Sequence, residues 1–114
     1  VAIAAGELKH GTIALIEEGT LVMALATQER LFEKMCSNML EVKARGAHVV
    51  AIAQEGRTEI EKYASEVFYI PHTMDELAPL LSIIPLQLLA YYVSAARGND
   101  VDKPRNLAKS VTVE

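Results

Sequence analysis

A short segment near the start of the chain gathers side chains that could move protons. Residues 6–11 hold Glu7, Lys9 and His10 between two glycines. Glycine lets a backbone come close to a ligand, and histidine gains and loses a proton near neutral pH. The pattern indicates either a ligand-binding loop in which His10 transfers protons or a solvated turn whose charges face water. The residues by themselves favour the solvated turn, because loop charges are usually exposed.

The other two histidines and the single cysteine give weaker signals. His48 lies beside a segment rich in valine and isoleucine, where a partly buried structural histidine is expected. His72 follows Pro71 at the expected carboxyl end of a strand, an edge where open α/β sheets bind ligands. Cys36 lies on an apolar helical stripe and is predicted to be a core residue. The histidines make no metal-binding pair on a helix, so no metal site is predicted.

Lys109 lies in the tail segment 105–110 and carries a primary amine. Such an amine forms a Schiff base with a carbonyl compound when burial or nearby charge lowers its pKa. The ordinary pKa of a lysine is about 10.4, so an exposed tail lysine would be protonated and unreactive. Composition alone therefore favours an inert Lys109, and only a tail folded into a site would change that.

Alternating strand and helix patterns must position these side chains. Continuous apolar runs predict strands over 20–27, buried on both faces, and over 47–53. A third strand is predicted over 66–70 and ends before a proline. Apolar residues at helical spacing predict a helix over 29–45, and a shorter one is expected over 58–64. This order predicts an α/β fold with a parallel sheet and right-handed crossovers.

The last predicted helix covers the most apolar part of the chain. Thr73 and Glu76 match a capping box, which predicts a helix from there to the end of the apolar stretch 77–96. Pro85 is interior and should kink it. The stretch is about as long as a membrane span, but the flanking segments are ordinary α/β elements, so it is interpreted as a buried helix. The tail 99–114 shows neither helical nor strand period.

Composition limits the classes of function. The chain has 114 residues, which favours one domain, and its 51% apolar content argues against disorder. A formal charge of −4 gives no electrostatic footprint for nucleic acid. One cysteine fits a reducing compartment. No secretory signal, phosphate loop or dinucleotide fingerprint occurs, so no cofactor is predicted.

Three spaced segments, 100–114, 85–92 and 5–11, resemble the glucosamine-6-phosphate synthase family in the same order. In that family a glutaminase domain releases ammonia from glutamine, and two SIS (sugar isomerase) domains convert fructose 6-phosphate to glucosamine 6-phosphate. Each SIS domain is a three-layer αβα sandwich around a parallel sheet. The resemblance implies that residues 1–114 are the C-terminal portion of the second SIS domain. It also implies that the fold is incomplete, with about three strands, and that 99–114 is a catalytic tail.

The resemblance also implies roles for individual residues. Lys109 matches the lysine that forms the Schiff base with the open-chain sugar. His10 matches a histidine that assists ring opening in the site of the neighbouring subunit, which implies a homodimer. Ala108 matches a residue whose backbone touches the sugar, and Val111 one near the path of ammonia. The implied partners are the sugar phosphate and the other domains of the parent chain, with no nucleic acid or membrane, in the cytoplasm.

The family's glutamate base and most of its sugar-phosphate contacts are expected upstream of residue 1. We therefore expect the 114-residue chain alone to be inactive, with Lys109 solvated. An incomplete sheet would leave an open edge or an uncovered apolar face, which predicts dimerisation or strand exchange. Two alternatives remain: a non-catalytic sugar-phosphate-binding module, and a purely structural dimerisation piece.

Overall fold

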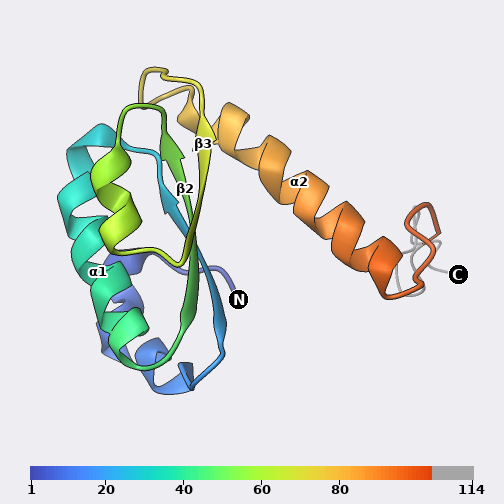
Figure 1. Cartoon of the computed structure of the whole chain (residues 1–114), viewed down its shortest axis with the longest axis horizontal. Coiled ribbons are helices and arrows are strands. Elements are labelled where there is room, and N and C mark those ends of the chain that lie inside the picture. The colour runs from blue at the N-terminus through green and yellow to red at the C-terminus, as the bar shows by residue number, and fades with distance from the viewer. Residues whose placement is uncertain (104–114) are drawn as a thin grey trace, which may run out of the picture. The chain divides into compact units, whose positions relative to one another are not determined.

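Three parallel strands form the sheet of the computed structural model, which describes residues 1–103 (Figure 1). They are β1 (Leu21–Ala26), β2 (His48–Gln54) and β3 (Glu66–Ile70), in the order β1-β2-β3. Both pairings are parallel, and β2 is the central strand. The predicted α/β class with a parallel sheet is confirmed, and β3 has the predicted bounds.

Helical segments connect the strands and follow the last one. The predicted helix over 29–45 is present, but its first turn is a 3-10 helix, and the short predicted helix over 58–64 is 3-10 as well. The chain divides into two compact units, and the boundary between them lies after Ser82. The segments are η1 (Ala5–His10), η2 (Thr12–Leu15), η3 (Glu29–Leu31), α1 (Phe32–Ala44), η4 (Thr58–Lys62) and α2 (Ala78–Ala96).

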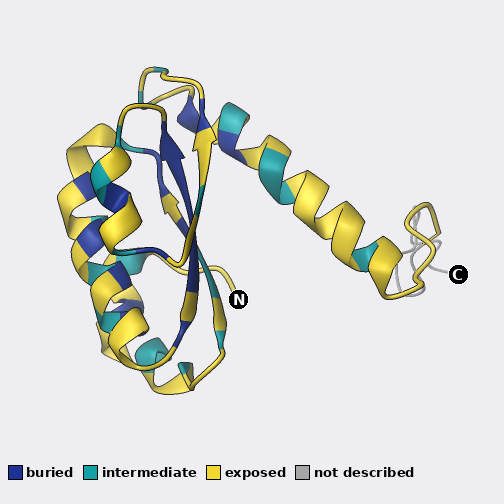
Figure 2. Cartoon of the chain, viewed as in Figure 1, coloured by how far each residue is buried: buried dark blue, intermediate teal, exposed yellow. Residues whose placement is uncertain are grey.

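Helix α1 covers one face of the sheet and forms the core there (Figure 2). Its buried side chains recur every three or four residues, which is the spacing of one helical face. They meet the side chains of β2 that alternate onto the same face. Each fully buried large apolar side chain contributes about 1.5–3 kcal/mol to stability. The helix supplies Phe32, Cys36, Met39 and Val42, and the strand supplies Val49, Ala51 and Ala53.

Strand β1 is buried on one face only, so the prediction of two buried faces is wrong. Ala24 and Ala26 point toward the core beside α1 and are 3% exposed. Leu21 and Leu25 lie on the opposite face and are 59% and 45% exposed. An apolar run predicts a strand with apolar side chains on both faces. It does not show which other layers of the fold cover each face. In the described residues one helical layer covers β1.

The prediction of a buried last helix is also wrong for the described residues. Helix α2 buries only Ala78 and Ser82, both in its first turns. Its mean hydropathy is 1.5, and 11% of its residues are buried. By length and composition alone, such a helix could cross a membrane or lie in the core of a soluble protein. The helix continues through Pro85. Its exposed apolar side chains are Leu80, Ile83, Ile84, Leu88, Leu89, Tyr91, Tyr92 and Val93.

The core position predicted for Cys36 is confirmed and carries a chemical consequence. Its side chain is buried, and burial, followed by the charge of the Glu59 carboxylate, raises the pKa of the thiol. The thiolate is the reactive form of cysteine. At pH 8 we expect a disulfide reagent to label Cys36 about 100-fold more slowly in the folded chain than in denaturant. Labelling at similar rates would mean that α1 opens readily or that the thiol is accessible.

Candidate functional site

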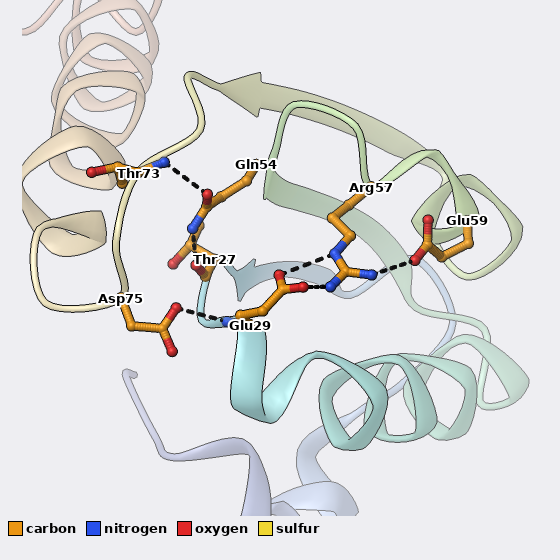
Figure 3. A network of polar contacts seen from close by, with 7 residues as sticks. All are labelled: Thr27, Glu29, Gln54, Arg57, Glu59, Thr73 and Asp75. Carbon is orange, nitrogen blue, oxygen red and sulfur yellow. Dashed lines mark hydrogen bonds and ion pairs between the residues drawn. The ribbon is translucent and has the colours of Figure 1, made fainter.

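Side chains from three loops meet where the parallel strands end (Figure 3). Strand β1 ends at Ala26, β2 at Gln54 and β3 at Ile70. Because the strands are parallel, their carboxyl ends lie along one edge of the sheet. Open α/β sheets bind ligands at this edge, so a ligand site is expected there.

Gln54 bridges the two loops on either side of the central strand. Its side chain is 2% exposed. Its Nε2 donates to the backbone carbonyl of Thr27 at 2.7 Å, and its Oε1 accepts from the backbone N–H of Thr73 at 2.9 Å. A carbonyl needs a donor and an N–H needs an acceptor, so these partners define which way the amide faces. One buried side chain therefore joins the end of β1 to the segment after β3.

Asp75 makes a second long-range bond from the same segment. Its Oδ1 accepts from the backbone N–H of Glu29 at 2.9 Å. The first N–H groups of a helix lack partners within the helix, so Asp75 caps η3 from a distant part of the chain. The capping box predicted at Thr73 is wrong: α2 begins at Ala78. Tertiary hydrogen bonds at Thr73 and Asp75 take the place of the local pattern.

Arg57 organises the charged side of the edge. Its guanidinium forms a bidentate ion pair with Glu29, with Nε 3.0 Å from Oε2, and its Nη1 lies 3.0 Å from Glu59. The same group lies over the Phe32 ring at 4.9 Å. A backbone hydrogen bond and then the bond from Arg57 lower the pKa of Glu59. These groups are partly exposed, and exposed ion pairs contribute little to stability, so they orient the loops more than they stabilise the fold.

The polar groups at this edge are occupied with one another. Within residues 1–103, no buried side-chain nitrogen or oxygen lacks a hydrogen-bond partner. Across the same residues, no group of three or more His, Cys, Asp or Glu side chains is arranged to hold a metal ion. At the described part of the edge, the side chains of Gln54, Arg57 and Asp75 therefore fix the geometry of the loops.

His10 is placed by η1 near the other end of α1. Leu8 is buried in the core cluster, and Lys9 Nζ lies 2.5 Å from Glu41 Oε1, near the end of α1. These contacts hold η1 on α1 and leave the side chain of His10 exposed. Glu29 precedes the first turn of α1, so the structure does not bring His10 together with the residues at the carboxyl edge.

The remaining predicted residues divide into three cases. His48 is exposed, with Nε2 3.0 Å from Glu66 Oε1 at the amino end of the strands, so the prediction of a partly buried histidine is wrong. Its neighbours Ala47 and Val49 belong to the core cluster with α1, so the side chain of His48 points to the opposite face of the sheet. His72 follows β3 at the carboxyl edge, as predicted, and is exposed. Lys109, Ala108 and Val111 lie outside the described residues.

Sequence reasoning missed the residues that organise the edge. Gln54, Arg57 and Asp75 are polar residues of loops and strand ends, which are usually only solvated. One signal could have found the first of them: a glutamine directly after the apolar run 47–53 must satisfy its amide where the chain is still buried. The partners of the other two are far away in sequence, and no local pattern points to them.

A parallel sheet backed by α1, with loops joined at the carboxyl ends of its strands, defines the class of the chain. The profile of the SIS domain family matches residues 1–97. The chain therefore belongs to the SIS domain family, and the predicted SIS-type fold is confirmed.

Curated relatives narrow the comparison within that family. The chain is 66% identical over 110 residues to a glutamine–fructose-6-phosphate aminotransferase (isomerizing) of Caldanaerobacter subterraneus subsp. tengcongensis, covering 96% of this chain and 18% of the relative. It is 65% identical over 113 residues to the protein of that name from Clostridium tetani, covering 99% and 19%. It thus spans about a fifth of the length of these relatives.

A solved structure agrees with the curated relatives. The chain superposes on the C-terminal domain of glucosamine-fructose-6-phosphate aminotransferase from Francisella tularensis with a TM-score of 0.82 and 36% identity. The match covers 88% of this chain and 28% of that structure. The resemblance seen in the three sequence segments is confirmed.

Proposed function

We propose that the chain is the C-terminal portion of an SIS domain that converts fructose 6-phosphate and glutamine-derived ammonia to glucosamine 6-phosphate. One observation carries this proposal: the 65% identity to a named aminotransferase extends over 113 residues. A match of that length takes in the tail as well as the folded part. In this proposal residues 1–114 belong to one domain, 99–114 are its catalytic tail, and the protein works in the cytoplasm.

Lys109 is the proposed nucleophile of the reaction. Its neutral amine attacks the ketone carbon of the open-chain sugar, a C–N bond forms, and the carbonyl oxygen leaves as water to give the Schiff base. Ala108 is the proposed backbone contact to the sugar. The chain spans about a fifth of the length of its relatives, and this supports the expectation that it needs their other parts for turnover.

His10 is proposed to assist ring opening in the site of a second copy of the chain. Its exposed position on η1, away from the carboxyl ends of its own strands, supports a role outside the site that those strand ends would form. A homodimer is also supported by exposed apolar side chains, of which Leu21 on β1 is 59% exposed. Packing such side chains against a second copy would remove their apolar surface from water.

A chimera tests the proposed function. In it the chain replaces the matching 110 residues of the Caldanaerobacter relative, which is 66% identical there. We expect it to form glucosamine 6-phosphate from fructose 6-phosphate and glutamine, with kcat/KM within about tenfold of the parent enzyme. The isolated chain, treated with fructose 6-phosphate and borohydride, should form no adduct. A folded chimera that binds fructose 6-phosphate without turnover would contradict the proposal and favour a non-catalytic SIS module.

A further inference from the structure

We propose that Leu8 and Glu41 are positioning residues for His10, an inference that rests on the proposed function. His10 is the last residue of η1, and its side chain is exposed. The two residues directly before it, Leu8 and Lys9, both contact other parts of the folded unit. The residues that hold the segment are therefore distinct from the residue that is proposed to act on the sugar.

Apolar contacts hold the backbone on both sides of His10. Leu8 is 9% exposed and belongs to the core cluster. Ile13, three residues after His10, is partly buried and packs against the same cluster. These contacts restrict the path of the backbone through His10, because a shift of the segment would return apolar surface to water. Removing most of the Leu8 side chain would leave a cavity or let η1 move into it.

An ion pair with α1 orients the same segment. Lys9 Nζ lies 2.5 Å from Glu41 Oε1, and the two side chains are 53% and 37% exposed. An exposed pair contributes little to the stability of a fold. Among the described residues, however, no side chain caps the start of η1, so this pair is the polar contact that fixes its rotation. Consecutive side chains of a 3-10 helix are about 120° apart, and holding Lys9 therefore sets the direction of the Cα–Cβ bond of His10.

The proposed ring opening requires an imidazole in a defined place. The bond between C2 and the ring oxygen breaks, the anomeric hydroxyl loses its proton as C2 becomes a ketone, and the ring oxygen gains a proton. A side chain that assists these transfers must lie about 2.6–3.2 Å from the oxygen concerned. A misplacement of about 1 Å can cost about 100-fold in rate. Loosening η1 should therefore slow the reaction through His10.

A double-mutant cycle in the chimera tests the positioning role. Glu41→Ala removes the ion pair and Leu8→Ala removes the apolar contact, each alone and in combination with His10→Ala. Glu33→Ala is the matched control, because Glu33 is an exposed glutamate of the same helix, about two turns before Glu41. Hemiketals also open in water without a protein, so a chimera that lacks His10 should keep measurable turnover. Rates are measured where circular dichroism shows all variants equally folded.

The expected result is a loss that depends on the presence of His10. We expect kcat/KM for fructose 6-phosphate to fall about three- to fivefold in Glu41→Ala and about tenfold in Leu8→Ala. In the His10→Ala background neither substitution should lower it further, because a residue that acts only through His10 then has nothing to position. The control should leave kcat/KM unchanged in both backgrounds.

Three results would overturn the positioning role. Equal losses with and without His10 would show that the two residues act on other parts of the protein. Unchanged kcat/KM in both single variants, or a His10→Ala chimera as fast as the unchanged one, would show that nothing acts through His10. In these three cases an active unchanged chimera leaves the overall proposed function standing. An unchanged chimera that makes no glucosamine 6-phosphate would instead overturn the proposed function, and the positioning role with it.

Discussion

Replacing Lys109 by arginine in the chimera should abolish both turnover and the sugar adduct trapped by borohydride. Arginine keeps the positive charge, but its guanidinium stays protonated and cannot form an imine. We expect kcat to fall by at least about 1,000-fold, because the covalent route is lost and not merely weakened. Binding of fructose 6-phosphate should change by less than about threefold, since the charge is preserved. Mass spectrometry of the reduced adduct and calorimetry of sugar-phosphate binding measure the two quantities.

Lys34→Arg is the matched control for this substitution. Lys34 is an exposed lysine of α1, outside the proposed tail 99–114, so its replacement changes the same chemical group outside the proposed site. Its adduct yield should equal that of the unchanged chimera. An adduct that survives in Lys109→Arg would assign the Schiff base to another lysine and would remove the central residue of the proposed function.

Gly46→Ala should lower the free energy of unfolding by about 2–4 kcal/mol. Gly46 ends the turn after α1 with a φ of 88°, a left-handed conformation that costs an L-residue about 1–2 kcal/mol. A Cβ built there would lie 2.9 Å from the Cα of Glu18. That neighbour is backbone, and the carbonyl of Gly46 accepts from the N–H of Gly19 at 2.8 Å, so the turn cannot move aside without losing a bond. Urea unfolding followed by circular dichroism measures the loss.

Gly56→Ala separates the two contributions. Gly56 has a φ of 92°, but a Cβ there would meet nothing within 4 Å. Its replacement should cost only the backbone strain, about 1–2 kcal/mol. The difference between the two variants then reports the crowding against Glu18. Equal losses would mean that the turn around Glu18 relaxes and that crowding is not what requires glycine at position 46.

The spacing of apolar residues and the positions of proline and glycine were enough to predict where most helices and strands lie in the sequence. The stripe that contains Cys36 and Met39 predicted α1, because apolar side chains spaced three or four apart fall on one helical face. Strand β3 has its predicted bounds because a proline follows it directly. Gly46 is left-handed where the sequence predicted the end of α1. The resemblance carried by three short segments identified the family, since motifs in the same order over nearly the whole chain rarely match by chance.

By itself, then, the amino-acid sequence determined the order of strands and helices, the parallel α/β class and the membership of the SIS family. Only the tertiary structure decided which surfaces are covered and which loops are joined. Leu25 and α2 are apolar, yet they are exposed in the described residues, because burial depends on the elements that pack against them. Gln54 joins Thr27 to Thr73 across 27 and 19 positions of sequence. Hydrogen bonds of that range form only after the strands have brought their carboxyl ends together, so no local pattern records them.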